Sequence, residues 1–402
     1  MTTDDQTSAD ETSVDLSPAV QDRRSRPSVL YVATIASTIR HFLIPYANHL
    51  RAMGWRVDAA ANGATDDPRL VAAFDRVNEL PLSRSILDGR GLLRGEQAME
   101  AILSDGYDIV HVHTPIASFI TRLAVRRMRP SARPSVVYTA HGFHFHHGGS
   151  PVSNLIFRTA ERVAGRWTDR LIVINEEDRE AALRHRIVPA SRLIHLPGIG
   201  LDTSAYAPAR LDADGRTTKN RAGVPTAPPL FIVMAELRAN KRVGDVVRAV
   251  AAMRHRDVHL LILGTGPDRA RTAALIEELG LADRVRLLGF VEGIQPILAG
   301  ATALVLASRR EGLARSIMEA LALEVPVVAS SARGNTELVG RDGFVVPVGD
   351  VAGLATSMDW LIDHPAERAE MGRRGRQRMV ERFDLRPLIE AHEALYRSLL
   401  RH

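Results

Sequence analysis

Two series of short apolar runs, separated by longer amphipathic segments, constrain the fold of this 402-residue chain more than any other feature. Runs that are apolar throughout, rather than alternating with polar residues, predict strands of parallel sheets covered by helices on both faces. The sequence therefore predicts an α/β fold with two doubly wound, Rossmann-like domains. The first series comprises residues 29–33, 57–61, 109–113, 136–140, 171–174 and 193–196, with helical segments such as 42–53, 116–129 and 154–164 between the runs. The second series comprises residues 230–234, 258–263, 285–288, 303–307, 326–329 and 344–347.

The break between the two series predicts the domain boundaries. Residues 1–27 are polar and acidic, which is typical of a disordered tail, and residues 28–200 form the expected N-terminal domain. Residues 201–228 are rich in Pro, Gly and Asp and are expected to link it to a C-terminal domain at 229–402. The last amphipathic segment, 387–400, could pack on either domain. Because parallel sheets bind ligands at the carboxyl ends of their strands, the cleft between the domains is the expected site.

Composition narrows the class of protein. With 45% hydrophobic and 25% charged residues the chain is typical of a globular protein, and its lack of cysteine excludes disulfides, zinc–thiolate sites and a cysteine nucleophile. We find no apolar segment long enough to span a bilayer, and residues 1–20 do not resemble a secretory signal. We therefore expect a cytoplasmic protein, with a possible peripheral position on the inner face of the cell membrane.

The charge distribution suggests an anionic partner. The first twenty residues hold five of the 47 acidic residues, so the remainder carries a formal charge of +10. On one continuous helix Arg158, Arg162, Arg166 and Arg170 would form a basic stripe, in a domain that also contains Arg122, Arg126, Arg127 and Arg129. Such a stripe is either a solvated face or a docking surface for anionic lipid. The absence of an aromatic stacking motif near these arginines argues against nucleic acid.

The strongest local motif runs from Ser308 to Ala320, where a buried strand is followed by a loop and a helix. A helix N-terminus presents free N–H groups to a phosphate. Glu311 in the loop and Glu319 in the helix can each accept hydrogen bonds from neighbouring sugar hydroxyls, so together the motif favours a nucleotide-sugar. The alternative is a helix-capping acid and an ordinary surface glutamate. A dehydrogenase is disfavoured, because residues 261–267 lack the third glycine of a dinucleotide fingerprint.

Several spaced motifs resemble those of the retaining GT-B glycosyltransferases of family 4, and of bacterial capsule and exopolysaccharide glycosyltransferases in particular. The resemblance covers about residues 28–400. Its motifs are the Glu311-x7-Glu319 pair, Gly334-Asn335-Thr336-Glu337-Leu338-Val339, His111-Val112-His113-Thr114-Pro115, Tyr138-Thr139-Ala140-His141-Gly142-Phe143-His144-Phe145, Ile174-Asn175-Glu176-Glu177-Asp178 and Gly198-Ile199-Gly200-Leu201-Asp202.

The resemblance implies a role for each matching residue. Glu319 would bind the donor ribose, Glu311 the donor sugar, Lys241 the leaving diphosphate, and His141 would reach over the sugar from the N-terminal domain. Where the family often has arginine this chain has Glu236, and Arg238 is the expected substitute. Backbone amides near the helix start would meet the sugar and diphosphate; they belong to Gly312, Leu313, Ala314, Arg315 and Ser316.

The sequence thus predicts a glycosyltransferase that moves a sugar from a nucleotide-sugar to a glycan or lipid-linked acceptor, in capsule, exopolysaccharide or related cell-surface glycan synthesis. We expect a UDP- or GDP-sugar as co-substrate, no cofactor, no metal and no nucleic acid. His141, His144, His146 and His147 cluster without a metal-ligand spacing, and Asp212-Ala213-Asp214 lies in the linker. Two alternatives remain: a GT-B nucleotide-sugar epimerase, and a non-catalytic nucleotide-sugar-binding regulator of another glycosyltransferase.

Overall fold

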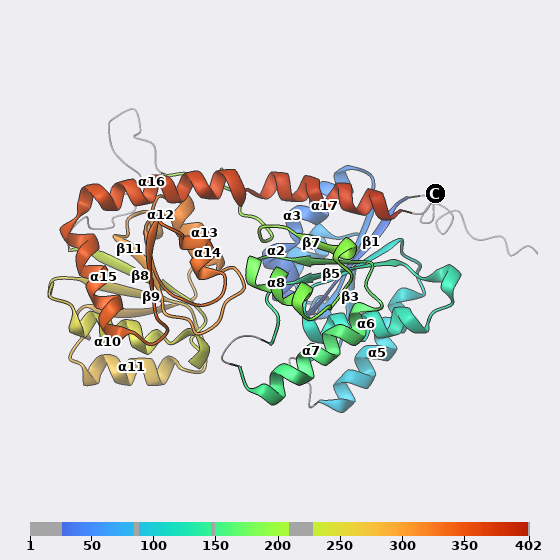
Figure 1. The fold of residues 1–402 in the computed structure, drawn as a ribbon, viewed down its shortest axis with the longest axis horizontal. Helices are drawn as coiled ribbons and strands as arrows, with labels where there is room; N and C mark the ends of the chain where they lie inside the picture. Colours follow the sequence, from blue (N-terminus) through green and yellow to red (C-terminus); the bar gives the residue numbers. More distant parts are fainter. Residues whose placement is uncertain (1–25, 84–87, 146–148, 209–227, 401–402) are drawn as a thin grey trace, which may run out of the picture.

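The computed structural model describes residues 26–83, 88–145, 149–208 and 228–400, which form two α/β domains side by side (Figure 1). Each domain has one parallel sheet between two layers of helices, so the predicted fold class is confirmed. The expected disordered tail, up to residue 25, lies outside the described residues, as do 209–227 of the expected linker.

The N-terminal sheet has seven strands in the order β3-β2-β1-β4-β5-β6-β7. Its strands are β1 (Ser28–Ile35), β2 (Arg56–Asn62), β3 (Arg76–Glu79), β4 (Ile109–Val112), β5 (Ser135–Ala140), β6 (Arg170–Val173) and β7 (Leu193–His195). Its helices are α2 (Ala36–Phe42), α3 (Ile44–Ala52), α4 (Pro68–Ala73), α5 (Gly89–Leu103), α6 (Pro115–Arg127), α7 (Pro151–Gly165) and α8 (Glu176–Arg184).

Two elements of this domain differ from the expectation. The helix expected at 42–53 is observed as α3, and the separate helix α2, which precedes it, was not expected; Pro45 at the start of α3 cannot donate the hydrogen bond that would continue α2 into α3. Strand β3 was not expected. It is an edge strand whose four residues, of which only Val77 is apolar, provide almost none of the hydrophobic signal of a buried strand.

The C-terminal sheet has six strands in the order β10-β9-β8-β11-β12-β13. Its strands are β8 (Leu230–Met234), β9 (His259–Leu263), β10 (Val285–Gly289), β11 (Ala303–Leu306), β12 (Val327–Ser330) and β13 (Gly343–Val346). Its helices are α10 (Val243–Ala252), α11 (Arg269–Glu278), α12 (Gln295–Ala299), α13 (Arg315–Ala322), α14 (Asn335–Val339), α15 (Val351–Asp363) and α16 (Pro365–Arg382).

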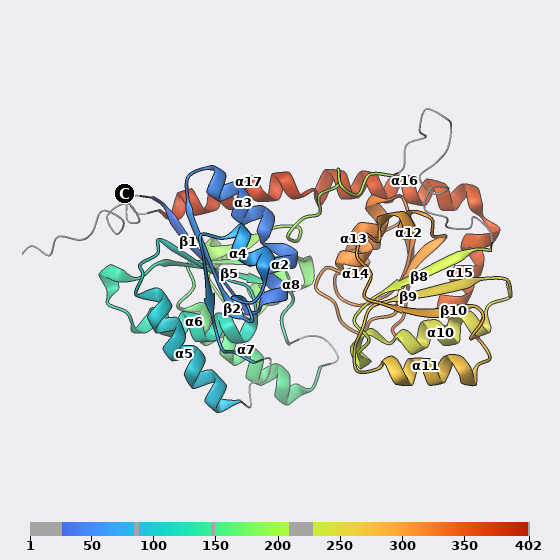
Figure 2. The same cartoon turned by 180° about the vertical axis from the view of Figure 1, so that it is seen from behind.

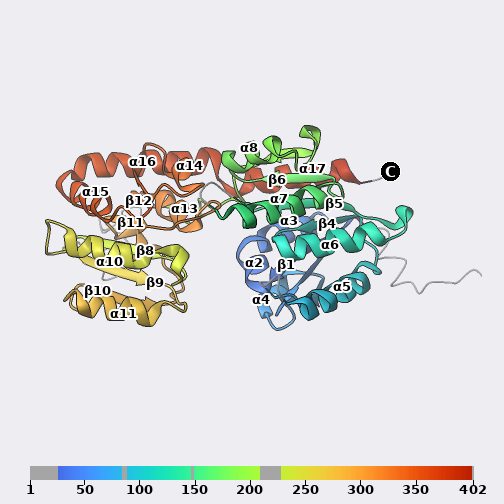
Figure 3. The ribbon, with the colours of Figure 1, turned by 60° about the horizontal axis from the view of Figure 1, so that its bottom comes forward.

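Each sheet buries apolar side chains on both faces. In the N-terminal domain, α5, α6 and α7 lie along one face (Figure 3), and residues of α2, α3 and α4 pack on the other. In the C-terminal domain, α10, α11 and α15 cover one face, while α12, α13, α14 and α16 cover the other. Burial on both faces explains why the strands read as continuous apolar runs.

The chain crosses between the domains a second time near its C-terminus. Helix α16 packs against α13, and the next helix, α17 (Leu385–Leu399), lies along α3 of the N-terminal domain (Figure 2). Tyr396 of α17 is fully buried in the N-terminal core. At the crossing the Leu201 amide donates to the Phe383 carbonyl (2.9 Å) and the Leu385 amide donates to the Leu201 carbonyl (3.0 Å). The two connections between the domains are therefore bonded to each other.

The expected arginine stripe does not exist as one helix face. Helix α7 ends at Gly165, where a side chain would meet the Ile187 carbonyl at 1.9 Å; Arg166 caps the helix and Arg170 belongs to β6. Arg122, expected to add surface charge, is buried with its guanidinium 3.1 Å from the Glu161 carboxylate. Spacing in the sequence cannot reveal where a helix stops or which arginine has a buried partner.

Candidate active site in the interdomain cleft

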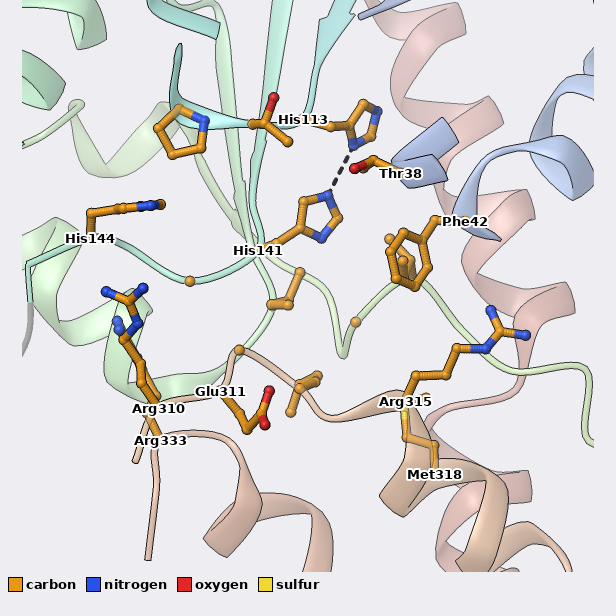
Figure 4. A pocket seen from close by; sticks show the side chains of 18 of the residues that line it. Thr38, Phe42, His113, His141, His144, Arg310, Glu311, Arg315, Met318 and Arg333 are labelled. Atoms are coloured by element: carbon orange, nitrogen blue, oxygen red, sulfur yellow. Dashed lines mark hydrogen bonds between the residues drawn. The ribbon is translucent and has the colours of Figure 1, made fainter. Parts of the chain in front are cut away.

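A cavity of about 390 Å³ lies between the domains, where the carboxyl ends of strands from the two sheets face each other (Figure 4). The N-terminal domain contributes the chain after β1, β4, β5 and β6 and the turn at 198–200, and the C-terminal domain contributes the loops after β8, β11 and β12. This is the position expected for a ligand site in open parallel sheets. The side chains labelled in Figure 4 are Thr38, Phe42, His113, His141, His144, Arg310, Glu311, Arg315, Met318 and Arg333.

His141 directly follows β5, and its imidazole points into the cavity above Glu311 (Figure 4). Its Nε2 atom lies 3.2 Å from Nδ1 of His113, and its ring stacks on Phe42 with centroids 6.0 Å apart. Burial, with a smaller contribution from the nearby His392, lowers the pKa of His141 to about 4. His141 is therefore a neutral imidazole near pH 7, able to form hydrogen bonds with sugar hydroxyls.

Glu311 and Lys241 come from loops that follow neighbouring strands, β11 and β8. Nζ of Lys241 lies 2.6 Å from Oε1 of Glu311. The Arg309 amide donates to the Asn240 carbonyl (2.8 Å), and the Asn240 amide group donates to the Arg310 carbonyl (3.0 Å). These bonds hold the two loops together, so the ammonium and the carboxylate occupy one position beneath the cavity.

The segment from Gly312 to Ser316 leads into α13, which begins at Arg315. Gly312 is packed so tightly that a side chain would meet the His141 carbonyl at 1.9 Å. This contact crosses the cleft and requires glycine. Gly312, Leu313 and Arg315 line the cavity, whereas Ala314 is buried and Ser316 does not contribute to the lining. The free amides at the start of α13 provide a positive dipole end beside Glu311.

Glu319 lies one turn into α13 and is 7% exposed. Its Oε1 atom accepts hydrogen bonds from the Tyr206 hydroxyl (2.9 Å) and from Nε of Arg315 (2.8 Å). Arg315 also donates to the His41 carbonyl of the N-terminal domain (2.8 Å). Glu319 does not line the cavity around His141. It lies one helical turn further along α13 than Arg315, which does line the cavity.

Arg238 does not reach this cavity. Its Nε atom lies 2.6 Å from the carboxylate of Glu236, and it lines a separate cavity of about 540 Å³ beside α10 and α11. The residue expected to replace the missing phosphate-binding arginine is instead paired with the glutamate that stands in its place. Lys241 does not line the cavity directly either, and is connected to it through Glu311.

Sequence reasoning assigned no role to five residues that the structure brings to this region: Phe42, His113, Tyr206, Arg310 and Arg333. His113 lies within one motif of the family resemblance and Arg333 directly precedes another, so the resemblance was the one signal that could have predicted a role for them. Phe42 and Tyr206 carry no local signal, because each reaches the site only through the packing of the two domains.

Neither a metal cluster nor a membrane span is found in the described ranges. Within them, no group of three or more His, Asp or Glu side chains could hold a metal ion. His146 and His147 of the histidine cluster lie outside the described residues. None of the described helices is long and apolar enough to cross a membrane.

Comparison with known families identifies the class of protein that this fold and cleft define. Residues 214–378 match the model of the "Glycosyl transferases group 1" family, and residues 40–198 match that of the "Glycosyl transferase 4-like domain". Among curated proteins, the "Putative glycosyltransferase EpsD" of Bacillus subtilis (strain 168) is 31% identical over 378 residues, which cover 92% of this chain and 97% of the relative. The chain belongs to this family of GT-B glycosyltransferases, as the motifs predicted.

A further relative is similar in sequence, and two solved structures share the fold. The "UDP-Gal:alpha-D-GlcNAc-diphosphoundecaprenol alpha-1,3-galactosyltransferase" of Escherichia coli is 26% identical, over 72% of this chain and 75% of the relative. Anabaena HepE, solved in complex with UDP, has a TM-score of 0.74 at 20% identity and covers 92% of this chain and 100% of HepE. A sucrose-phosphate synthase from Thermosynechococcus elongatus has a TM-score of 0.78 at 20% identity, covering 93% and 99% of the two chains.

Proposed function

We propose that this protein is a retaining glycosyltransferase that moves a sugar from a nucleotide-sugar to a glycan or lipid-linked acceptor in cell-surface polysaccharide synthesis. One observation carries the proposal: Glu311, in the loop that leads to α13, lies across the cleft from His141 (Figure 4) and is paired with Lys241. An ammonium and free helix amides suit a diphosphate, while a carboxylate and a neutral imidazole suit the hydroxyls of a sugar.

The proposed reaction uses these groups as follows. Lys241 and the amides of residues 312–316 stabilise the charge that builds on the diphosphate as the glycosyl–phosphate bond breaks. Glu311 then accepts hydrogen bonds from the sugar, and His141 contacts it from above. The acceptor oxygen bonds to the anomeric carbon from the side of the leaving group, and its proton passes to the departing phosphate oxygen. The configuration at the anomeric carbon is thereby retained.

We propose a UDP- or GDP-sugar as the donor, bound without a metal ion or a cofactor. Glu319 would hold the two ribose hydroxyls in place of its present bonds to Tyr206 and Arg315. Support for UDP comes from HepE, whose solved complexes contain UDP and UDP-glucose. The cationic charge at this end comes from Lys241, because Arg238 is engaged by Glu236.

We also propose that the protein works in the cytoplasm, docked on anionic lipid through the outer face of α7. Val152, Leu155 and Ile156 are more than half exposed near the start of this helix, and Arg162 and Arg166 are exposed towards its end. An apolar patch next to arginines suits the interface of a negatively charged membrane. Binding to vesicles should need anionic lipid, weaken with salt and weaken in Ile156→Ser; equal binding to neutral vesicles contradicts this docking mode.

Thermal unfolding with UDP, GDP, ADP, dTDP and CMP tests the donor site. A nucleotide at 100 times its dissociation constant adds about 2.7 kcal/mol to the free energy of unfolding, which is readily measured. We expect stabilisation by UDP or GDP, lost in Glu319→Ala. No stabilisation by any nucleotide would contradict the donor site. Nucleotide binding without turnover on any acceptor would instead favour a regulator of another glycosyltransferase.

A further inference from the structure

One end of the cleft cavity holds two arginines that the reaction proposed above does not use. Figure 4 shows Arg310 and Arg333 side by side at the end of the cavity nearest His144, away from Arg315 and the start of α13. Arg310 precedes Glu311 in the loop after β11, and Arg333 precedes Gly334 in the loop after β12. The two loops follow adjacent strands, so the sheet itself brings the guanidinium groups together.

Arg333 is fixed in place. Its side chain is 4% exposed; Nη1 pairs with the fully buried Asp178 of α8, and Nη2 donates to the Phe143 carbonyl (2.8 Å). Its third nitrogen, Nε, is buried and has no hydrogen-bond partner among the described residues. A buried guanidinium N–H without a partner is uncommon, which indicates that a further acceptor belongs at this end of the cavity.

Arg310 has no counter-ion of its own. Among the described residues its side chain forms neither a salt bridge nor a hydrogen bond, whereas Glu311 is occupied by Lys241 and Asp178 by Arg333. Burial and the like charge of Arg333 lower the pKa of Arg310, and the charge of Glu311 opposes this shift without overcoming it. The two cations therefore repel each other in a partly buried space, where the neighbouring carboxylates, Glu311 and Asp178, are already paired with Lys241 and Arg333.

We propose that Arg310 and Arg333 form a subsite for an anionic group, a phosphate or a carboxylate, carried by one of the two substrates. Two adjacent guanidinium groups provide several N–H donors within reach of one another, which suits the oxygens of a carboxylate or a phosphate. The subsite rests on the proposed function for its place in the reaction. The anion belongs either to the donor sugar, as a carboxylate on its ring, or to the acceptor, as a phosphate next to the sugar that receives the transfer.

Phosphate binding to the full-length protein, measured by calorimetry with UDP saturating, tests the subsite. We expect the wild type to bind one phosphate, and Arg310→Gln to bind it about 10- to 100-fold more weakly, as for the loss of a charged hydrogen bond. Arg309→Gln is the matched control, because the neighbouring Arg309 is exposed and does not line the cavity. Equal phosphate affinity in the wild type and Arg310→Gln overturns the proposal, as does phosphate binding that UDP abolishes.

Two further comparisons assign the source of the anion. If it is on the donor, the wild type should prefer UDP-glucuronate to UDP-glucose, and Arg310→Gln should lose that preference. If it is on the acceptor, Arg310→Gln should raise KM for a lipid diphosphate acceptor but not for the unphosphorylated glycoside. If Arg310→Gln loses phosphate binding but changes neither the donor preference nor the KM of the acceptor, the site binds an adventitious ion only, and the proposed subsite is overturned. Because phosphate binding is read without turnover, failure of the proposed glycosyl transfer is distinguishable from failure of the subsite.

Arg333→Lys provides a second variant. It keeps the charge that pairs with Asp178 but removes the planar set of donors, so the fold should survive while phosphate binding weakens. A Tm equal to that of the wild type, with unchanged phosphate affinity, would exclude Arg333 from the subsite.

Discussion

Lys241 and Glu311 are 70 positions apart in the sequence, and their charged atoms lie 2.6 Å apart beneath the cleft. Each is only partly exposed, with 25% of the lysine side chain and 11% of the glutamate side chain accessible. A nucleotide-sugar would separate the pair, because its diphosphate attracts the ammonium and its hydroxyls attract the carboxylate. The ion pair thus keeps both groups oriented while the donor is absent.

This relationship predicts the effect of Lys241→Ala. Loss of a group that stabilises leaving-group charge should lower kcat by about 100- to 1,000-fold while the protein remains folded. Lys241→Arg, which keeps the charge, should retain more activity than Lys241→Ala. Steady-state kinetics with the donor identified by thermal unfolding provides the measurement, and circular dichroism monitors the fold. An unchanged kcat in Lys241→Ala would remove this residue from the mechanism.

Gly312→Ala should prevent the cleft from closing. The new methyl group would meet the His141 carbonyl at 1.9 Å, and because this carbonyl belongs to the other domain, the domains can separate to relieve the clash. We expect each domain to stay folded, the radius of gyration in X-ray scattering to rise, and kcat to fall. Gly89→Ala is the control, because a methyl group there meets nothing within 4 Å. Wild-type activity in Gly312→Ala would contradict a closed catalytic state.

Glu161→Ala should strongly destabilise the N-terminal domain. The Glu161 carboxylate accepts hydrogen bonds from Arg122 (3.1 Å) and from the Tyr138 hydroxyl (2.9 Å), all within the core. Its removal leaves the buried Arg122 without a counter-ion, at a cost of about 3–5 kcal/mol in the free energy of unfolding. Urea unfolding measures the loss. Glu390→Ala, which removes an exposed helical pair with Arg386, should change stability little. Equal losses of stability in the two variants would contradict a larger energetic contribution from the buried pair.

Stability should depend on pH through four histidines beneath the cleft: His111, His113 and His392, which are buried, and His141, which is half-buried. Burial lowers the pKa of all four, to about 4 for His141 and His392. The titratable groups in ring contact with the three buried histidines are Tyr31, Tyr46 and Tyr396, whose pKa values burial raises. His141 instead contacts Phe42 and faces Glu311 across the cavity. The cluster is therefore uncharged near neutral pH.

The sign follows from proton binding. Between about pH 4 and 6.5 the unfolded chain protonates these histidines and the folded protein does not, so stability is complete above pH 6.5 and is lost as pH falls. Urea unfolding between pH 5 and 7.5 should show this slope. His392→Asn, which can keep a bond to the Leu388 carbonyl, should have a shallower slope than the wild type. Identical slopes would show that His392 titrates normally in the folded state.

Much of the fold could be predicted from local residues. The continuous apolar runs indicated parallel sheets, and every expected strand corresponds to an observed one, because burial on both faces leaves a signal in each strand by itself. The exceptions have identifiable physical causes. Strand β3 is a polar edge strand, and the end of α7 depends on close packing at Gly165 rather than on helix propensity.

The sequence by itself identified the glycosyltransferase family through its spaced motifs. It also predicted the positions of Glu311 and Glu319 around the start of a helix, because a strand, loop and helix that follow one another in the chain leave a local pattern. The sequence could not predict three contacts: the pairing of Arg238 with Glu236, the buried ion pair of Arg122 with Glu161, and the hydrogen bond from Tyr206 to Glu319. Nor could it show that Arg310 and Arg333 share one end of the cleft. Those relationships join residues from separate loops and domains, and charge pairing and burial are decided only when the sheets and the two domains have packed together.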